Sequence, residues 1–287
     1  MTAVVIVYHK AFELAQKIVN ELKSRDVKAC KRSVVTVQKY THAEKRFPVM
    51  YLLEEIWFVP SHDKVKQFYT FIEHCKSICG VLLPSPDLSC DVRRKAYVPH
   101  LLDYMLPGTV FCDKIDDIER CISTNRTCVV RLKPGMLGEG KAHVCLGGRR
   151  RSVYAKDMLA KYGSFVLQPN IDAGMFEIKI PVLDHKLIYN DYVSESDDDD
   201  VQGAIKVMLK FAIELHKKVE NTFKMPSAYR IDICTVEDDT GVLHPYLQEL
   251  EILGALIYTY RFVGRKIEID ISKAVSNEVV SYLRVQC

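Results

Sequence analysis

Apolar residues in the first part of this chain follow strand spacing and helix spacing in turn. A β-branched and apolar run over 3–8 predicts a buried strand, and apolar positions three and four apart over 11–23 predict the helix that follows. Further strands are predicted over 33–37, 56–59 and 80–83. A helix over 63–79 precedes the last of these strands. Because strands that alternate with helices favour a parallel or mixed sheet, residues 1–88 are predicted to form an N-terminal αβ domain.

From residue 89 onward the pattern favours short strands and longer helices. Helices are predicted over 92–105, 115–122, 152–162 and 201–219, and strands over 109–112, 163–168, 176–182 and 187–192. Within 176–182 apolar and polar residues alternate strictly, so one face of the strand is buried and Glu177 and Lys179 share the other. This charged face is either the wall of a site or a face open to solvent.

The segment 129–144 sets a buried-type strand, a lysine and a glycine-rich turn in immediate succession. Glycines adopt backbone angles closed to other residues and bring bare amides close to phosphate oxygens. The phosphate-binding candidates are Lys133, Gly135, Gly138, Gly140 and Lys141. Ala142 stands where a P-loop has Ser or Thr, and a second strand follows it instead of a helix. The segment is therefore a glycine hairpin, which either closes over a polyphosphate or is an ordinary β-hairpin.

Acidic residues gather on a predicted hairpin whose strands lie over 229–234 and 244–252. Period-two alternation puts Glu249 and Glu251 on one face, and pairing across the hairpin can bring Asp232 beside them. Converging carboxylates repel unless a cation lies among them, and oxygen ligands of this kind suit Mg²⁺ that is held partly by nucleotide phosphates. The alternative is a solvated face with unrelated acids.

Composition and charge exclude some classes of function. With 48% hydrophobic and 27% charged residues among 287, the chain can bury a core, and a formal charge of +3 does not indicate nucleic-acid binding. No apolar run approaches the length of a membrane span, and the N-terminus shows no leader, so a cytoplasmic protein is expected. The ten cysteines are scattered, which is typical of free thiols in a reducing compartment.

Several of these features occur in a characteristic order. They are Lys95 on a helix, Lys133 before the glycine loop, a strand ending in 167–171, the charged pair Glu177 and Lys179, the Arg-x-Asp motif of Arg230 and Asp232, and the Glu-x-Glu motif of Glu249 and Glu251. This order resembles the ATP-grasp superfamily over residues 91–262. The Glu-x-Glu form departs from the commoner Glu-x-Asn and resembles a glutathione-synthetase-like subgroup of carboxylate–amine ligases.

The resemblance implies an α/β (α+β) fold, in which a Rossmann-like pre-ATP-grasp domain over 1–88 precedes an ATP-grasp module over 89–287. The module would divide into an N-terminal subdomain over 89–168, with the glycine loop, and a C-terminal subdomain over 169–287, with the metal-site hairpin. The compact size, the many thiols and an irregular acidic loop would suit a viral or divergent eukaryotic member.

The resemblance also implies a role for each motif, with ATP and Mg²⁺ as cofactors. Lys95 and Lys133 would contact the nucleotide phosphates, and the loop over 135–140 would close over them. The hinge against adenine would consist of Gln168, Pro169, Asn170 and Ile171. Lys179 would be directed at the γ-phosphate or the substrate, and Arg230 would help to neutralise the transferred phosphoryl group. The Mg²⁺ ligands would be Asp232, Glu249 and Glu251.

The activity implied by the resemblance is an ATP- and Mg²⁺-dependent ligation of a carboxylate to an amine or thiol through an acyl phosphate. The partners would be a small-molecule or peptide carboxylate and a nucleophile, and a homodimer is the family-level expectation. One alternative is a small-molecule kinase, such as an inositol phosphate kinase, which stops after one transfer. Another is a non-catalytic nucleotide-binding regulator or scaffold. Release of inorganic phosphate separates the ligase from the kinase.

Overall fold

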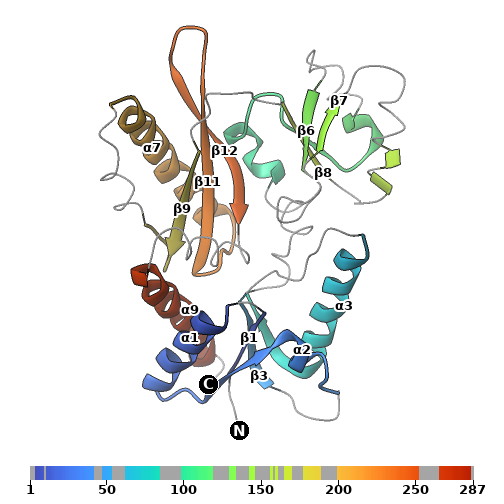
Figure 1. Ribbon diagram of the computed structural model, residues 1–287, viewed down its shortest axis with the longest axis vertical. Helices are drawn as coiled ribbons and strands as arrows, with labels where there is room; N and C mark the ends of the chain where they lie inside the picture. Colours follow the sequence, from blue (N-terminus) through green and yellow to red (C-terminus); the bar gives the residue numbers. More distant parts are fainter. Residues whose placement is uncertain are drawn as a thin grey trace.

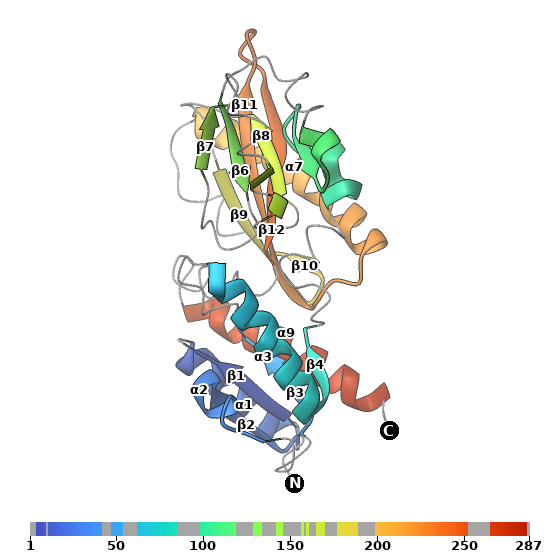
Figure 2. The ribbon, with the colours of Figure 1, turned by 90° about the vertical axis from the view of Figure 1, so that its right-hand side faces the viewer.

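The computed structural model describes residues 4–9, 11–41, 47–53, 62–84, 98–118, 129–133, 142–145, 156–157, 159–160, 165–169, 177–188, 199–251 and 265–285. Within these residues the chain forms three four-stranded sheets. The first sheet lies apart from the other two, and the second and third sheets lie side by side (Figures 1 and 2). None of the described helices has the length and apolar character needed to cross a bilayer.

The first sheet is parallel and has the order β2-β1-β3-β4. Its strands are β1 (Val4–Tyr8), β2 (Ala29–Ser33), β3 (Phe47–Leu52) and β4 (Cys79–Leu83). Helices α1 (Phe12–Ser24) and α3 (His62–Ile78) connect consecutive strands as the sequence predicted. The predicted parallel αβ sheet is therefore confirmed, whereas β3 was not predicted and the strand expected over 56–59 lies outside the described residues.

The strand predicted over 33–37 is wrong. β2 ends at Ser33, and the next residues form a helical turn, α2 (Val34–Val37). The Ser33 hydroxyl accepts a hydrogen bond of 3.2 Å from the backbone N–H of Thr36, which is an N-cap contact. The β-branched residues after Ser33 favour a strand, but this cap closes a helical turn instead.

The last helix, α9 (Arg265–Val285), returns to the first sheet and packs against α1 (Figure 1). Among its described residues, the buried apolar ones are Ile271, Ala274, Val275 and Val279. They share one apolar cluster with Val4 and Ile6 of β1 and with Leu14 and Ile18 of α1. Residues far beyond the predicted division at 88 thus complete the core of the first sheet.

The second sheet is antiparallel and has the order β10-β9-β11-β12. Its strands are β9 (Glu177–Leu183), β10 (Lys186–Leu187), β11 (Ala228–Glu237) and β12 (Leu243–Glu251). The long helix α7 (Asp199–Thr222) covers one face and buries Met208, Ala212, Leu215 and Val219 against the sheet. The predicted helix over 201–219 and both strands of the acidic hairpin are confirmed.

The hairpin between β11 and β12 closes through Asp238 and Gly241. The Asp238 carboxylate accepts hydrogen bonds from the N–H groups of Thr240, at 2.9 Å, and Val242, at 3.0 Å. Contacts with the Thr240 hydroxyl and the His244 ring, together with these N–H groups, hold the pKa of Asp238 well below its usual range. Gly241 has a φ of +83°, which favours glycine. This turn sets the register of the two strands that carry the acids.

The third sheet has the order β5-β8-β6-β7 and lies on the side of the second sheet opposite α7 (Figure 1). Its strands are β5 (Val110–Cys112), β6 (Val129–Lys133), β7 (Ala142–Cys145) and β8 (Phe165–Pro169), preceded by the short 3-10 helix η2 (Leu102–Tyr104). β6 and β7 pair antiparallel, which confirms the predicted strands on both sides of the glycine turn. A bridge between Met105 and Leu247 links this part of the chain to β12.

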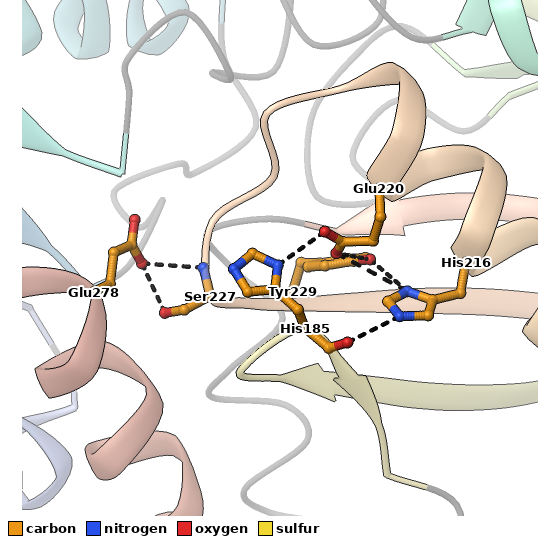
Figure 3. A network of polar contacts seen from close by, with 6 residues as sticks. All are labelled: His185, His216, Glu220, Ser227, Tyr229 and Glu278. Carbon is orange, nitrogen blue, oxygen red and sulfur yellow. Dashed lines mark hydrogen bonds and ion pairs between the residues drawn. The ribbon is translucent and has the colours of Figure 1, made fainter. Parts of the chain in front are cut away.

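A polar network joins α9 to the start of β11 (Figure 3). The Glu278 carboxyl accepts a hydrogen bond of 3.1 Å from the Ser227 N–H and lies 2.8 Å from the Ser227 hydroxyl. That hydroxyl also lies 2.9 Å from the carbonyl of Ala274. The Ser227 hydroxyl hydrogen is thus shared between the Glu278 carboxyl and the Ala274 carbonyl. Burial raises the pKa of Glu278, whereas hydrogen bonds from Ser227 and Tyr51 act in the opposite direction.

The same network fixes the end of α7 to the turn between β9 and β10. The Tyr229 hydroxyl lies 2.8 Å from a Glu220 oxygen and 2.9 Å from Nδ1 of His216. His185 contacts the other Glu220 oxygen through its ring and the His216 ring through its carbonyl. His185 and Asp184 both have positive φ values, of 60° and 51°, so these contacts hold a strained turn.

We expect Glu278→Gln to remove part of the pH dependence of stability. A carboxyl whose pKa is raised by folding stabilises the protein fully at acid pH, and that contribution is lost as the pH rises through the folded-state pKa. The variant, which stays neutral, should therefore gain on wild type between acid and neutral pH by on the order of 1 kcal/mol. Urea denaturation at several pH values measures this difference. Parallel stability profiles for the two proteins would contradict the assignment.

Candidate functional site

A row of charged residues crosses three strands of the second sheet. In the strand register Asp232 on β11 lies opposite Lys179 on β9 and opposite Glu249 on β12. The neighbouring positions Ile180, Ile231 and Leu250 are buried in the core that α7 covers. Since side chains alternate along a strand, the charged row lies on the other face, the side on which Figure 1 shows the third sheet. The predicted pairing of Asp232 with Glu249 is confirmed.

Arg230 and Asp232 form a two-pronged ion pair within this row. The distance from Nε to Oδ1 is 2.5 Å, and that from Nη2 to Oδ2 is 2.7 Å. Both side chains are buried, with exposed fractions of 7% and 4%. The guanidinium therefore occupies both oxygens of the carboxylate, which is the strongest geometry for such a pair.

Lys179 approaches the same carboxylate from β9. Its Nζ lies 3.8 Å from Oδ2 of Asp232 and 3.5 Å from Oε1 of Glu177. The Lys179 side chain is 47% exposed, in contrast to Arg230. Glu177 and Lys179 share one face while Ile178 and Ile180 are buried, as the alternation in the sequence predicted. Lys179 thus lies beside both acids on a side chain that is about half exposed.

The electrostatics of Asp232 follow from this crowding. Burial raises the pKa of its carboxyl, and the hydrogen bonds and charge of Arg230 act in the opposite direction. The nearby Glu249 raises the pKa further, and Lys179 lowers it. Two carboxylates that face each other in a buried setting require cations beside them. Arg230 and Lys179 supply those cations in the described part of the site.

A β-bulge lies next to the acids. The register shifts between Asp232 and Ile233, so that Ile233 pairs with Leu247 and leaves Gln248 as the extra residue on β12. Bulges often occur beside active sites, where they redirect a side chain. Gln248 is buried and was not predicted as part of the site. Apolar and polar residues do not alternate clearly over 247–250. The sequence therefore did not predict where the register of the two strands shifts.

The donor set fits Mg²⁺. Asp232 and Glu249 offer carboxylate oxygens across the hairpin, and Glu251 lies opposite Arg230 in the register, although its side chain is outside the described part. Among the described residues no three acidic, histidine or cysteine side chains converge on one point. Mg²⁺ commonly uses one or two protein carboxylates together with phosphate oxygens and water, so two carboxylates suffice. The three predicted ligands stay a prediction.

Gln168 lies on β8 of the third sheet. It is 1% exposed, and its amide nitrogen has no hydrogen-bond partner in the described structure. A buried donor without a partner costs stability, so an acceptor from a ligand would satisfy it. Lys133 and Pro169 lie at the ends of β6 and β8, and their side chains are outside the described part. The remaining predicted nucleotide contacts also lie outside the described residues: Lys95, Gly135, Gly138, Gly140, Lys141, Asn170 and Ile171.

Solved structures similar to this one cover nearly the whole chain. D-cycloserine synthetase DcsG superposes with a TM-score of 0.57 at 13% identity, over 96% of this chain and 98% of that one. A RimK domain ATP-grasp protein from Sphaerobacter thermophilus gives 0.55 at 14% identity, over 95% and 98%. A RiPP-associated ATP-grasp ligase from Chryseobacterium gregarium, in complex with ADP and a leader and core peptide, gives 0.52 at 12%, over 98% and 97%. The chain has the ATP-grasp fold.

The predicted fold class is therefore confirmed, with a parallel αβ sheet before the antiparallel ATP-grasp sheets. No family model and no curated protein matches the sequence. Within the ATP-grasp fold, the structure brings together four of the predicted site residues, which are Lys179, Arg230, Asp232 and Glu249. It places Gln168 on the neighbouring sheet. The chemical roles of all five stay predictions.

Proposed function

We propose that this protein is an ATP- and Mg²⁺-dependent ligase that joins a carboxylate to an amine or thiol. The charged row of the second sheet carries this proposal, because Asp232 is buried beside Arg230 and Glu249 within the ATP-grasp fold. A buried ionic cluster is a poor way to stabilise a sheet, since well-packed apolar residues of similar volume usually do as well or better. Binding of phosphate groups and a metal ion would explain why these ionic side chains are buried here.

In this proposal each side chain has a role in positioning charge. Asp232 and Glu249 would hold Mg²⁺, which when bound neutralises negative charge on the phosphate oxygens. Lys179, exposed beside them, would contact the phosphoryl group during transfer. The substrate carboxylate would attack the γ-phosphorus, ADP would leave, and the nucleophile would then displace inorganic phosphate from the acyl phosphate. The buried Gln168 amide would donate to the nucleotide.

The substrate is proposed to be a small-molecule or peptide carboxylate. The C. gregarium ligase was solved with a leader and core peptide, which supports including peptides among the candidates. A screen should combine ATP and Mg²⁺ with amino acids and peptides, each with and without an amine or thiol. The readouts are inorganic phosphate, ADP and, with hydroxylamine as the nucleophile, a hydroxamate.

The three activities predict different results in this screen. A ligase releases ADP and inorganic phosphate in equal amounts and forms the hydroxamate. A small-molecule kinase releases ADP, retains the phosphate on its acceptor and forms no hydroxamate. A regulator binds nucleotide without either product, and this result or the kinase result would overturn the proposal.

We expect Lys133→Ala to lower ATP turnover by about 100-fold, because it removes a cation from the nucleotide phosphates. The residue ends β6, directly before the predicted glycine loop. Lys206→Ala is the matched control, since Lys206 is exposed on α7, the helix that covers the opposite face of the second sheet. Steady-state ADP release measures both variants. Equal rates for the two would remove Lys133 from the site.

A further inference from the structure

The hydrogen bonds around the His216 ring need more hydrogens than the neutral side chains supply (Figure 3). Nε2 of the ring lies 3.0 Å from the carbonyl oxygen of His185, and Nδ1 lies 2.9 Å from the Tyr229 hydroxyl. The same hydroxyl lies 2.8 Å from Oε1 of Glu220. These three contacts need three hydrogens, whereas the Tyr229 hydroxyl supplies one and a neutral imidazole supplies one.

The Tyr229 hydroxyl hydrogen does not serve two of these contacts at once. Its oxygen lies 2.8 Å from Glu220 and 2.9 Å from His216, and those two atoms are 3.9 Å apart. The two partners are therefore at nearly a right angle about the hydroxyl oxygen. A hydrogen shared between them would make angles of about 120° with each, at which hydrogen bonds weaken steeply. Since the carbonyl of His185 only accepts, Nε2 of His216 uses the second hydrogen, and the third contact requires an additional proton.

We infer that His216 carries this proton, and that the resulting imidazolium is a pH-sensitive latch that holds the β9–β10 turn against α7 and β11. An imidazolium donates from both ring nitrogens, which satisfies all three contacts. Glu220 accepts from the Tyr229 hydroxyl and contacts the His185 ring at 2.8 Å, which favours its ionised form and leaves the proton on His216.

The charged groups around the ring agree with this placement of the proton. The Glu220 carboxylate, one turn along α7, lies 3.9 Å from Nδ1 and supplies the opposite charge. Burial, and then the hydrogen bond to Glu220, raise the pKa of Tyr229, so its hydroxyl keeps its hydrogen. On the turn itself the neighbouring titratable group is the His185 ring, and Glu278 on α9 interacts with it through charge.

The turn depends on contacts of this kind. Its two residues, Asp184 and His185, have φ values of 51° and 60°, which are unfavourable for residues other than glycine. Asp184 donates its N–H to the Ser227 carbonyl at 2.7 Å, and its carboxylate accepts from Asn277 on α9. The latch therefore acts at the point where α7, β11 and α9 meet.

Removal of the proton breaks one link of the latch. Two hydrogens then remain for three contacts, so either His216 releases the His185 carbonyl or Tyr229 releases Glu220. Histidine is the side chain whose charge ordinarily changes between about pH 5 and 8. The β9–β10 turn is therefore held by all three contacts on the acid side of this change and by two on the alkaline side. This inference does not depend on the proposed ligase activity.

Nitrogen NMR of the protein labelled with ¹⁵N-histidine tests where the proton lies. At neutral pH both ring nitrogens of His216 should show the shifts of protonated nitrogens, and the absence of these signals in His216→Gln identifies them. An unprotonated ring nitrogen in wild type at neutral pH would overturn the inference. This measurement on wild type stays decisive even if a variant fails to fold.

Hydrogen exchange of the Asp184 N–H tests the latch itself. After correction for the intrinsic exchange rate, we expect exchange to be about tenfold faster at pH 9 than at pH 6, as for the loss of a hydrogen bond to a charged group. The Leu53 N–H, which donates to the Val7 carbonyl at 3.0 Å in the first sheet, is the internal reference and should not change.

Two variants separate the latch from other effects of pH. His216→Gln has no titrating ring, so the exchange of its Asp184 N–H should be the same at both pH values. His100→Gln is the matched control, because His100 is exposed and contacts Phe223 just beyond the end of α7, and it should keep the tenfold response. The same response in His216→Gln, or no response in wild type, would contradict the latch.

Discussion

Replacing Asp232 by Asn is expected to lower nucleotide turnover on the order of 1000-fold, because it removes the buried charge around which the site is built. An amide keeps the shape of the side chain and can still accept a hydrogen bond from Arg230, so the variant should fold. It cannot supply the negative charge that holds Mg²⁺ beside Glu249. Steady-state ADP release at saturating ATP and Mg²⁺ measures the loss.

Asp239→Asn is the control for this substitution. Asp239 lies in the exposed turn of the same β11–β12 hairpin, so the same chemical change occurs away from the charged row. Its turnover should stay within about twofold of wild type, as expected for an exposed substitution that contacts no ligand. Normal turnover in Asp232→Asn would show that the charged row is not the active site.

Arg230→Met is expected to destabilise the fold by about 3–5 kcal/mol, because it leaves the buried Asp232 without its partner. The double variant Arg230→Met, Asp232→Leu should recover most of this loss, since apolar residues of similar volume often replace a buried ion pair without a net penalty. Urea denaturation of wild type, Arg230→Met, Asp232→Leu and the double variant gives the coupling between the two positions.

The matched control is Lys76→Met, which removes an exposed ion pair of 3.0 Å with Glu73 on α3. Exposed pairs contribute little, so a change within about 0.5 kcal/mol is expected. If the double variant were less stable than Arg230→Met alone, the ion pair would not be the reason for the loss.

Short-range patterns predicted much of this fold. Alternation placed Glu177 and Lys179 on one face, and the two acidic strands were paired correctly because their apolar positions had to face the same core. Helix α7 followed from its apolar stripe. These successes share a cause, since burial of one face fixes the spacing of residues along a single element.

The missed elements have separate causes. Ser33 caps a helical turn through the Thr36 N–H, whereas the β-branched residues after it favour a strand when they are considered alone. In α9 the buried positions Ile271, Val275 and Val279 do have helical spacing, so the signal was present and was not used. Its partner is the first sheet, however, and no local pattern tells a helix to pack against strands more than 200 residues away.

The candidate site was predictable in its residue types and only partly in its geometry. Arg230 and Asp232 are two residues apart, so a shared strand face follows from the sequence. Whether a guanidinium turns toward its neighbour or toward a ligand depends on the depth of burial, which spacing does not specify. The shift at Gln248 depends on how two strands meet, which neither strand encodes alone.

The most direct test of the central claim is the thermal unfolding midpoint with ATP or ADP, with and without Mg²⁺, in wild type and Asp232→Asn. A nucleotide at about 100 times its dissociation constant stabilises the native state by about 2.7 kcal/mol. A rise in the midpoint of wild type that requires Mg²⁺ and is absent in Asp232→Asn is the expected result. No shift with any nucleotide, or the same Mg²⁺-dependent rise in both proteins, would contradict a nucleotide and metal site at the charged row.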